Sequence, residues 1–245
     1  MAYSNSKLVS YTKISPNKTV NRTHLIDTIT IHCVVGQCSV ETLGNVFADK
    51  SRKASSNYGI GPDGRIGMYV EEKDRSWCSS NAANDHRAIT IEVASETKDP
   101  YKVTDKAYAA LLDLVTDICK RNNIKKLLWK GDKSLIGQVD KQNMTVHRWF
   151  ANKSCPGDYL YGKHPEIAAE VNKRLGVTEK ASSKEFKVRV NDASLNVRKG
   201  PGVLYSVVSK ITDKGVYTIV EEKNGWGKLK SGAGWISLKY CTKIK

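Results

Sequence analysis

The chain is 245 residues long, which allows either one large domain or a medium domain followed by a small one. Hydrophobic residues make up 40% of the sequence, enough for a real core, and no run of 18 apolar residues occurs, which excludes a membrane-spanning helix and argues against membrane insertion. The formal net charge of +15 implies an anionic partner.

The N-terminal sequence and the cysteines bear on the compartment. The start lacks the basic stretch and apolar segment of a secretory signal peptide, so we expect synthesis in the cytoplasm and action elsewhere after release. The six cysteines do not show the spacing of a disulfide framework, which suits a reducing compartment. Pairing among five of them stays open: Cys33, Cys38, Cys78, Cys119 and Cys241.

Positive charge is densest near the C-terminus. Residues 181–245 hold 13 Lys+Arg against 5 Asp+Glu. Nucleic acid is the usual first partner for such a surface, but the chain has no helix-turn-helix or zinc-finger spacing and no aromatic residues interleaved with a basic strip. An anionic cell-wall polymer satisfies the charge equally well. We therefore expect no nucleic-acid partner, and a nucleic-acid-binding protein remains an alternative supported by charge alone.

In chain order, the first 176 residues predict strands and helices around one sheet. An irregular arm over residues 1–25 precedes a strand at 28–35, and Ser39 is the expected N-cap of a helix through Lys50. A Pro-Asp-Gly turn at 62–64 joins two further strands. The remaining expected elements are a polar loop at 77–86, a strand at 88–94, a long helix capped by Thr104, a short buried strand at 127–129, a loop at 131–144 and a last helix from near Pro165 to Gly176.

Two of these strands share a pattern, Thr-Ile-His-Cys at 30–33 and Thr-Ile-Glu-Val at 90–93. If both lie in one sheet, alternation places His32 and Glu92 together on its polar face. An acid in an apolar strand is costly to bury unless it is paired or linked to a metal. The plainer alternatives are a hydrogen-bonded core histidine and a solvent-exposed glutamate at the rim.

A second histidine and a cysteine lie close together in the stretch from His147 to Cys155, which Pro156 and Gly157 follow. Imidazole and thiolate are good zinc ligands, and a Pro-Gly turn can bend a loop cysteine back toward a metal. On their own, a histidine and a cysteine at this spacing are more often unrelated, and a third ligand must come from elsewhere in the chain.

Beyond residue 176 the pattern changes. Residues 177–184 show no periodicity and predict a linker. In residues 185–245, apolar and polar residues alternate over short runs, and turns that contain glycine separate these runs. This pattern predicts a small all-β barrel. The expected organisation is a domain over 1–176, a linker over 177–184 and a second domain over 185–245.

The first region resembles the type-2 zinc N-acetylmuramoyl-L-alanine amidases, in the peptidoglycan-recognition-protein superfamily that includes many phage endolysins. The resemblance covers about residues 25–175 and rests on the strand ending Ile31-His32, the hairpin from Asn57 to Gly64, the Ile91-Glu92 strand and the stretch from His147 to Gly157. It implies a mixed α/β catalytic domain, a central sheet flanked by helices.

The resemblance also implies the site. Its metal ligands would be His32, His147 and Cys155, holding Zn²⁺ with one open position for water or the substrate carbonyl. The reaction would be hydrolysis of the amide between muramic acid and the first alanine of the stem peptide. Glu92 is then the candidate base and Lys153 the candidate for stabilising the oxyanion, the plainer role of Lys153 being a solvated surface lysine.

Part of the family pattern is absent. Where some members carry a catalytic tyrosine, alignment on Asp63-Gly64 places Ser56, and Tyr58 falls at a more buried aromatic position. A histidine that often follows a tryptophan in the middle of the domain is Cys78 here. These differences weaken a tyrosine-based mechanism and shift weight to Glu92.

The C-terminal region is similar to a bacterial SH3 domain, by the run Leu195-Asn196-Val197-Arg198 with Gly200-Pro201-Gly202, and by two Gly-Trp pairs. Such modules commonly bind the bacterial cell wall. Four side chains are candidates for lining a ligand groove, with core packing as the equal alternative for the tryptophans: Arg198, Tyr205, Trp226 and Trp235.

The favoured interpretation is a cell-wall lytic amidase, either a phage or prophage endolysin or a bacterial autolysin, with peptidoglycan as substrate. The main alternative is a non-catalytic peptidoglycan-binding protein of the same fold, which the presence of His32, His147 and Cys155 disfavours. The target species, the stem-peptide chemistry and the oligomeric state stay open.

Overall fold

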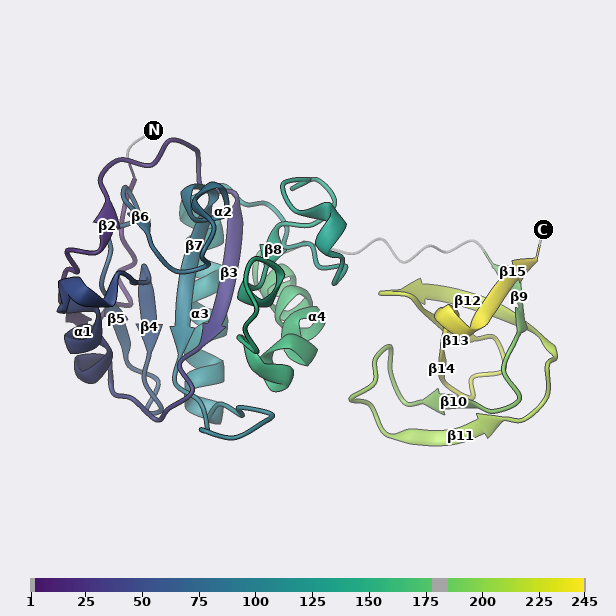
Figure 1. The fold of residues 1–245 in the computed structure, drawn as a ribbon. Helices are drawn as coiled ribbons and strands as arrows, with labels where there is room; N and C mark the ends of the chain where they lie inside the picture. Colours follow the sequence, from purple (N-terminus) through teal and green to yellow (C-terminus); the bar gives the residue numbers. More distant parts are fainter. Residues whose placement is uncertain (1–2, 178–184, 245) are drawn as a thin grey trace. The chain divides into compact units, whose positions relative to one another are not determined.

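The computed structural model of the protein describes residues 3–177 and 185–244. The chain divides into two compact units, residues 1–177 and 178–245 (Figure 1). The linker expected over 177–184 lies, except for residue 177, outside the described residues. Among the helices of the described part, none has the length and apolar character needed to cross a membrane.

The first unit is built on a six-stranded mixed sheet (Figure 1). Its strands in spatial order are β1 (Tyr11–Thr12), β5 (Ile66–Met68), β4 (Tyr58–Ile60), β7 (Ala88–Val93), β3 (Thr28–Cys33) and β8 (Met144–Thr145). Strands β4, β7, β3 and β8 run parallel, whereas β4 and β5 form an antiparallel hairpin. Beside this sheet, β2 (Lys18–Thr19) pairs with β6 (Arg75–Ser76).

Helices cover the two faces of the sheet differently. The helices α3 (Asp105–Arg121) and α4 (Gly157–Arg174) bury the apolar side chains of β3 and β7 in the main core, and Figure 1 shows α3 behind the central strands. On the other face, α1 (Val40–Ala48) packs Leu43 and Phe47 against Tyr69. The rest of that face carries the polar residues of β3 and β7, so it is the face on which a site can form.

Gly59 in β4 allows α1 to approach the sheet. A Cβ atom at this position would lie 2.6 Å from Leu43 Cδ2 and 2.7 Å from Tyr69 Cε2, closer than side-chain carbons pack. Only glycine fits there, because the helix and the Tyr69 ring occupy the space that a side chain would need.

Several sequence predictions are confirmed. The Ser39 hydroxyl accepts the Thr42 N–H at the start of α1, and Thr104 accepts the Ala107 N–H at the start of α3. The turn at 62–64 joins β4 to β5, and α4 ends at Arg174 with Gly176 at a φ of +73°.

Other predictions are wrong. The arm is not wholly irregular, because it contributes β1 and β2, and the polar stretch 77–86 contains the start of α2 (Ala82–Arg87), capped by the Asn81 side chain. Residues 127–129 form no strand, because side chains of Asn143 and Asn172 bond their backbone; the strand beside β3 is β8 instead. Helix α4 begins eight residues before Pro165, which lies inside it.

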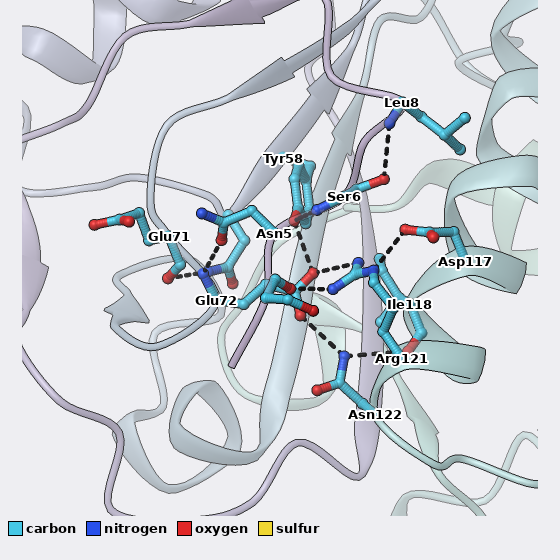
Figure 2. Close-up of polar contacts among 12 residues, drawn as sticks. Asn5, Ser6, Leu8, Tyr58, Glu71, Glu72, Asp117, Ile118, Arg121 and Asn122 are labelled. Carbon is cyan, nitrogen blue, oxygen red and sulfur yellow. Dashed lines mark hydrogen bonds and ion pairs between the residues drawn. The ribbon is translucent and has the colours of Figure 1, made fainter. Parts of the chain in front are cut away.

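A buried polar cluster around Glu72 joins the arm to the end of α3 (Figure 2). The Glu72 carboxylate is fully buried and accepts hydrogen bonds from the Tyr58 hydroxyl at 2.7 Å, Arg121 at 2.6 Å and Asn122 at 2.9 Å. The Asn5 side chain accepts the Glu72 backbone N–H at 2.9 Å. Every charged group in this cluster therefore has a partner, which is what permits its burial.

The second unit is all-β with its own apolar core. Its seven-stranded sheet follows the order β11 (Val207–Ile211), β10 (Leu195–Arg198), β14 (Trp235–Ser237), β13 (Trp226–Leu229), β12 (Val216–Lys223), β9 (Phe186–Val190) and β15 (Cys241–Ile244). The strands β11 and β15 were not foreseen from the sequence. β11 and β15 are the two edge strands of this sheet, and no pairing between them closes it within the described residues. The closed barrel expected from the sequence therefore stays a prediction.

Candidate metal and catalytic site

The site begins with the pairing of β3 and β7. In this parallel pair His32 is the direct neighbour of Glu92, so both side chains project from the same face, as the alternation predicted. The His32 ring is fully buried, while 17% of the Glu92 side chain is exposed. His32 Nδ1 and Glu92 Oε1 are 3.9 Å apart, near the carboxyl ends of the two strands, where ligands bind in open parallel sheets.

The segment from His147 to Cys155 closes over this face as a loop. His147 lies in a 3-10 turn, and the Arg148 backbone N–H donates to the Cys155 carbonyl at 3.1 Å. The Arg148 guanidinium donates to the Ser154 carbonyl at 2.5 Å and to Asp158 at 3.1 Å. Arg148 therefore ties the two ends of the loop together and holds His147 and Cys155 in one arrangement.

Gly157 is needed just after this loop. Its φ is +78°, and a Cβ atom there would lie 2.8 Å from the Tyr101 ring and 3.1 Å from the Pro100 carbonyl oxygen. The left-handed conformation and the close contact both require glycine, and together they start α4 directly behind Cys155.

The three predicted metal ligands come together. One ligand atom from each of His32, His147 and Cys155 lies within 4.8 Å of the others, and Cys155 Sγ is 3.3 Å from His32 Nδ1. Ligand atoms around a tetrahedral zinc are separated by about 3.5 Å, as bond lengths of about 2.0–2.3 Å require. The spacing therefore fits a zinc ion with small adjustments of the side chains.

The protonation states also suit a metal. Burial, together with the neighbouring His147, lowers the pKa of His32 to about 3, and burial and then Lys153 lower the pKa of His147. Both imidazoles are therefore neutral at neutral pH and free to coordinate. The hydrogen bond with Cys33 and burial raise the pKa of the Cys155 thiol well above its usual range, so its thiolate needs a cation beside it.

Glu92 and Cys78 form a second part of the cluster. The Cys78 thiol lies 3.9 Å from Glu92 Oε1, and His32, Cys78 and Glu92 make a second set whose ligand atoms lie within 4.8 Å of one another. Burial raises the pKa of Glu92 to about 8. Glu92 Oε2 and His32 Nε2 are buried without a hydrogen-bond partner in the described part of the chain, which marks the cluster as incomplete.

Side chains of α2 hold the loop that carries Cys78. The Asp85 carboxylate accepts the N–H groups of Cys78 and Ser79 and the Ser79 hydroxyl. Asn84 bonds Thr30 and Thr145, which joins this loop to β3 and β8. These hydrogen bonds hold the loop in place beside the candidate metal ligands.

The cluster opens into a cavity of about 580 Å³. Glu92, His147 and Lys153 line it, and the Ser80 hydroxyl lies 3.0 Å from His147 Nε2. Lys153 is exposed and close enough to His147 to influence its pKa. All five residues predicted for the catalytic site, His32, Glu92, His147, Lys153 and Cys155, therefore belong to this cluster or to the cavity wall.

The remaining predicted residues lie elsewhere. Ser56 is buried and donates to the Tyr58 carbonyl, and Tyr58 donates to Glu72, so neither lines the cavity. In the second unit, the Arg198 guanidinium donates to the carbonyls of Val203 and Tyr205, and Trp235 is only 8% exposed. Tyr205 is 49% exposed, and Trp226 is partly buried.

Sequence reasoning missed the supporting residues. Alternation placed Cys33 on the face opposite His32, yet Cys33 and Cys155 lie close enough for each thiol to shift the pKa of the other. Arg148 and Ser80 gave no signal, because an arginine and a serine in loops are common without a role. Cys78 stood out only through the resemblance to the amidases.

Known proteins are similar to part of this chain. The family model described as N-acetylmuramoyl-L-alanine amidase matches residues 21–158. Over 74 residues the chain is 28% identical to the putative N-acetylmuramoyl-L-alanine amidase YrvJ of Bacillus subtilis (strain 168), a stretch covering 29% of this chain and 14% of that protein. The chain thus spans only a small part of this curated relative.

Solved structures match the chain at low sequence identity. The catalytic domain of PlyG superposes with a TM-score of 0.50 at 17% identity, covering 69% of this chain and 96% of that one. A selenomethionine derivative of AmpD gives a TM-score of 0.49 at 17% identity, covering 71% of this chain and 99% of that one. Since the family match spans more than half of the sequence and includes His32, Glu92, His147 and Cys155, the chain belongs to the N-acetylmuramoyl-L-alanine amidase family.

Proposed function

We propose that the protein is a zinc-dependent peptidoglycan hydrolase that cleaves the amide between N-acetylmuramic acid and the L-alanine of the stem peptide. The observation that carries this proposal is the convergence of His32, His147 and Cys155 within 4.8 Å beside a cavity of about 580 Å³. Two imidazoles and one thiol leave one position of a tetrahedral zinc open, which is the pattern of catalytic rather than structural sites.

Zinc bound by these three residues would polarise the scissile carbonyl and lower the pKa of water beside it. The chain's own residues supply the rest. Glu92 lies next to His32, and burial raises its pKa. The positive charge of a bound zinc would oppose this rise and favour the carboxylate, which could then accept a proton from water and return it to the leaving amine. Lys153, on the cavity wall, would place positive charge near the developing oxyanion.

A non-catalytic peptidoglycan-binding protein is the competing function. A binding protein would need the cavity, but it would not need a complete set of metal ligands or a catalytic base. The presence of all three ligands, with an unpartnered carboxylate oxygen of Glu92 beside them, favours the enzyme.

For the second unit we propose a bacterial SH3-like module that holds the enzyme on the cell wall, as in an endolysin or an autolysin. Its separate apolar core, its exposed Tyr205 and the excess of basic residues in 181–245 support this role. The module would raise the local concentration of enzyme on the wall without adding a catalytic group. Residues 1–177 alone should then cleave soluble fragments normally and intact walls more slowly.

Mass spectrometry of digested peptidoglycan tests the proposed reaction. The expected products are stem peptides with a free alanine N-terminus and glycan chains with a free lactyl carboxylate. New reducing sugar ends, or cleavage inside the stem peptide, would contradict it. The competing binding function predicts retention on purified walls without any new termini.

A further inference from the structure

The active-site cavity has a cationic wall away from the metal cluster. Of the residues that line the cavity, four carry positive charge: Arg52, Lys53, Arg75 and Lys153. Lys153 adjoins His147, whereas the other three are contributed by the turn after α1 and by β6. We define Arg52, Lys53 and Arg75 as the cationic wall.

No residue of this wall is paired with an acid, although Arg75 and Arg52 lie near enough to Asp85 and Glu92 to act on the pKa values of those carboxyl groups. None of its three residues forms an ion pair with another described residue. Two acidic side chains also line the cavity, and both are engaged: Asp85 accepts the hydrogen bonds that hold the Cys78 loop, and Glu92 contacts His32 and Cys78. The wall is therefore a concentration of positive charge available to a ligand.

Arg75 is pre-positioned within the wall. Its Nη2 donates to Thr19 Oγ1 at 2.6 Å, and the same hydroxyl accepts the Trp77 indole N–H at 2.9 Å. Arg75 Nε is buried without a hydrogen-bond partner among the described residues. The two-stranded sheet of β2 and β6 thus anchors a guanidinium that still has a donor to satisfy, which costs free energy unless a ligand accepts from it.

Lys53 and Arg52 reach the cavity from a strained turn. Lys53 has a φ of +48° and lies at the end of the 3-10 turn Lys50–Arg52. A lysine in the left-handed region is unfavourable on its own, and such conformations are concentrated at binding sites.

We propose that the cationic wall binds a free carboxylate of the stem peptide, namely the α-carboxylate of the residue that follows the first alanine. This inference rests on the proposed amidase function. That residue is a glutamate joined through its side chain, so its α-carboxyl group is either free or amidated. The group lies within about 7 Å of the scissile amide, because consecutive Cα atoms are about 3.8 Å apart. A substrate at the metal cluster would therefore carry it into the same cavity.

The consequence is selectivity for stem peptides that are not amidated at this position. An arginine pairs with a carboxylate through two charge-assisted hydrogen bonds, whereas a carboxamide offers one weaker acceptor and no charge. We expect the free carboxylate form to be favoured by about 10-fold or more, with the preference decreasing as salt increases.

The test uses two muramyl dipeptides that differ only in this group, N-acetylmuramoyl-L-alanyl-D-glutamate and its D-isoglutamine analogue. The full-length zinc-loaded protein should show a kcat/KM at least about 10-fold higher for the first, carried mainly by KM. Calorimetric binding to Glu92→Gln protein, which should turn the ligand over about 100-fold more slowly, should give the same preference. Arg75→Gln and Arg52→Gln should each reduce it to about 3-fold or less.

Lys50→Gln is the matched control, because Lys50 lies in the same 3-10 turn but does not line the cavity. It should leave the preference unchanged. Equal kcat/KM and equal affinity for the two dipeptides would overturn the inference while leaving the amidase function intact, as would a preference that persists in both arginine variants. Failure of the proposed function is separate, since neither dipeptide would then be cleaved. If Arg75→Gln does not fold, Arg75→Lys and the exposed Arg52 decide the outcome.

Discussion

Two buried polar clusters lie in the first unit, and they differ in how completely their groups are paired. Around Glu72, the carboxylate has three hydrogen-bond donors and every charged group has a partner (Figure 2). Around His32, Glu92 Oε2 and His32 Nε2 have none within the described structure, and two pKa values are displaced far from their usual range. Both clusters bury ionisable groups beside the same sheet.

The difference separates stability from chemistry. A buried carboxylate with all its partners contributes to a unique fold and has little left with which to react. A cluster of two imidazoles, two thiols and a carboxylate without full pairing is costly unless a further group completes it. Substitutions in the metal cluster should therefore reduce activity more than stability, and substitutions around Glu72 should do the reverse.

The largest effect is expected for His147→Ala. Loss of one of three ligands should reduce bound zinc to a small fraction and lower turnover by more than about 100-fold, since even outer partners of a zinc ligand are worth 10–100-fold. Metal analysis and turnover on the same sample measure both quantities. His24→Ala, at an exposed position, is the control. Full activity of a zinc-free His147→Ala protein would remove the metal cluster from the mechanism.

Glu92→Gln should lower kcat by about 100-fold while zinc content and the thermal midpoint stay near those of the wild type. The amide keeps the shape of the carboxylate and loses its basicity. Glu96→Gln, at an exposed position just beyond β7, is the control. If Glu92→Gln keeps more than about half of the turnover, Glu92 is not the base, and a lowered midpoint with normal activity would make it a structural residue.

Glu72→Gln tests the fully paired cluster, where we expect a loss of stability and not of activity. Replacing the charge breaks its pair with Arg121, which is also bound to Asp117, and should cost about 2–3 kcal/mol of unfolding free energy. A loss of this size lowers the thermal midpoint by about 5–10 °C in a unit of this length. Calorimetry measures the midpoint, and the kcat of the folded fraction should be unchanged. A large fall in kcat at an unchanged midpoint would show that this cluster also serves catalysis.

Arg148→Lys should have the smallest effect. Lysine keeps the charge but cannot bond Ser154 and Asp158 at once, so the loop that carries His147 and Cys155 should loosen. Zinc affinity should fall by about 10-fold, measured by competition with a chelator. Lys163→Arg, in α4 where Lys163 pairs with Glu166 outside the His147 loop, is a matched control for the reverse exchange. Unchanged affinity would mean that the loop is held without the Arg148 contacts.

The sequence was most informative where chemistry depends on strand alternation. The shared Thr-Ile pattern at 30–33 and 90–93 predicted that His32 and Glu92 share a face if both strands lie in one sheet, because residues two apart in a strand face the same side. The pairing of β3 with β7 confirms this. Caps were equally readable at Ser39 and Thr104, since serine and threonine are preferred directly before a helix, where the hydroxyl accepts a backbone N–H of the first turn.

The sequence was least informative where side chains, and not a neighbouring strand, form hydrogen bonds with the backbone. Asn143 and Asn172 bond the backbone around Leu127, so a segment with a strand-like composition forms no strand. The start of α4 was placed too late, because Pro165 is tolerated inside the helix and the true start depends on how Gly157 packs against Tyr101. The cationic wall escaped notice as well, since Arg52 and Arg75 are brought together only by the fold.

The most direct test of the central claim, that His32, His147 and Cys155 hold one zinc, is X-ray absorption at the zinc edge. The wild-type protein should contain about one zinc with two imidazole nitrogens near 2.0 Å and one sulfur near 2.3 Å. The sulfur should disappear in Cys155→Ser and remain in Cys78→Ser, although Cys78 belongs to the second set of potential ligands. A sulfur that survives Cys155→Ser, or a fully active wild-type protein without zinc, would contradict the account.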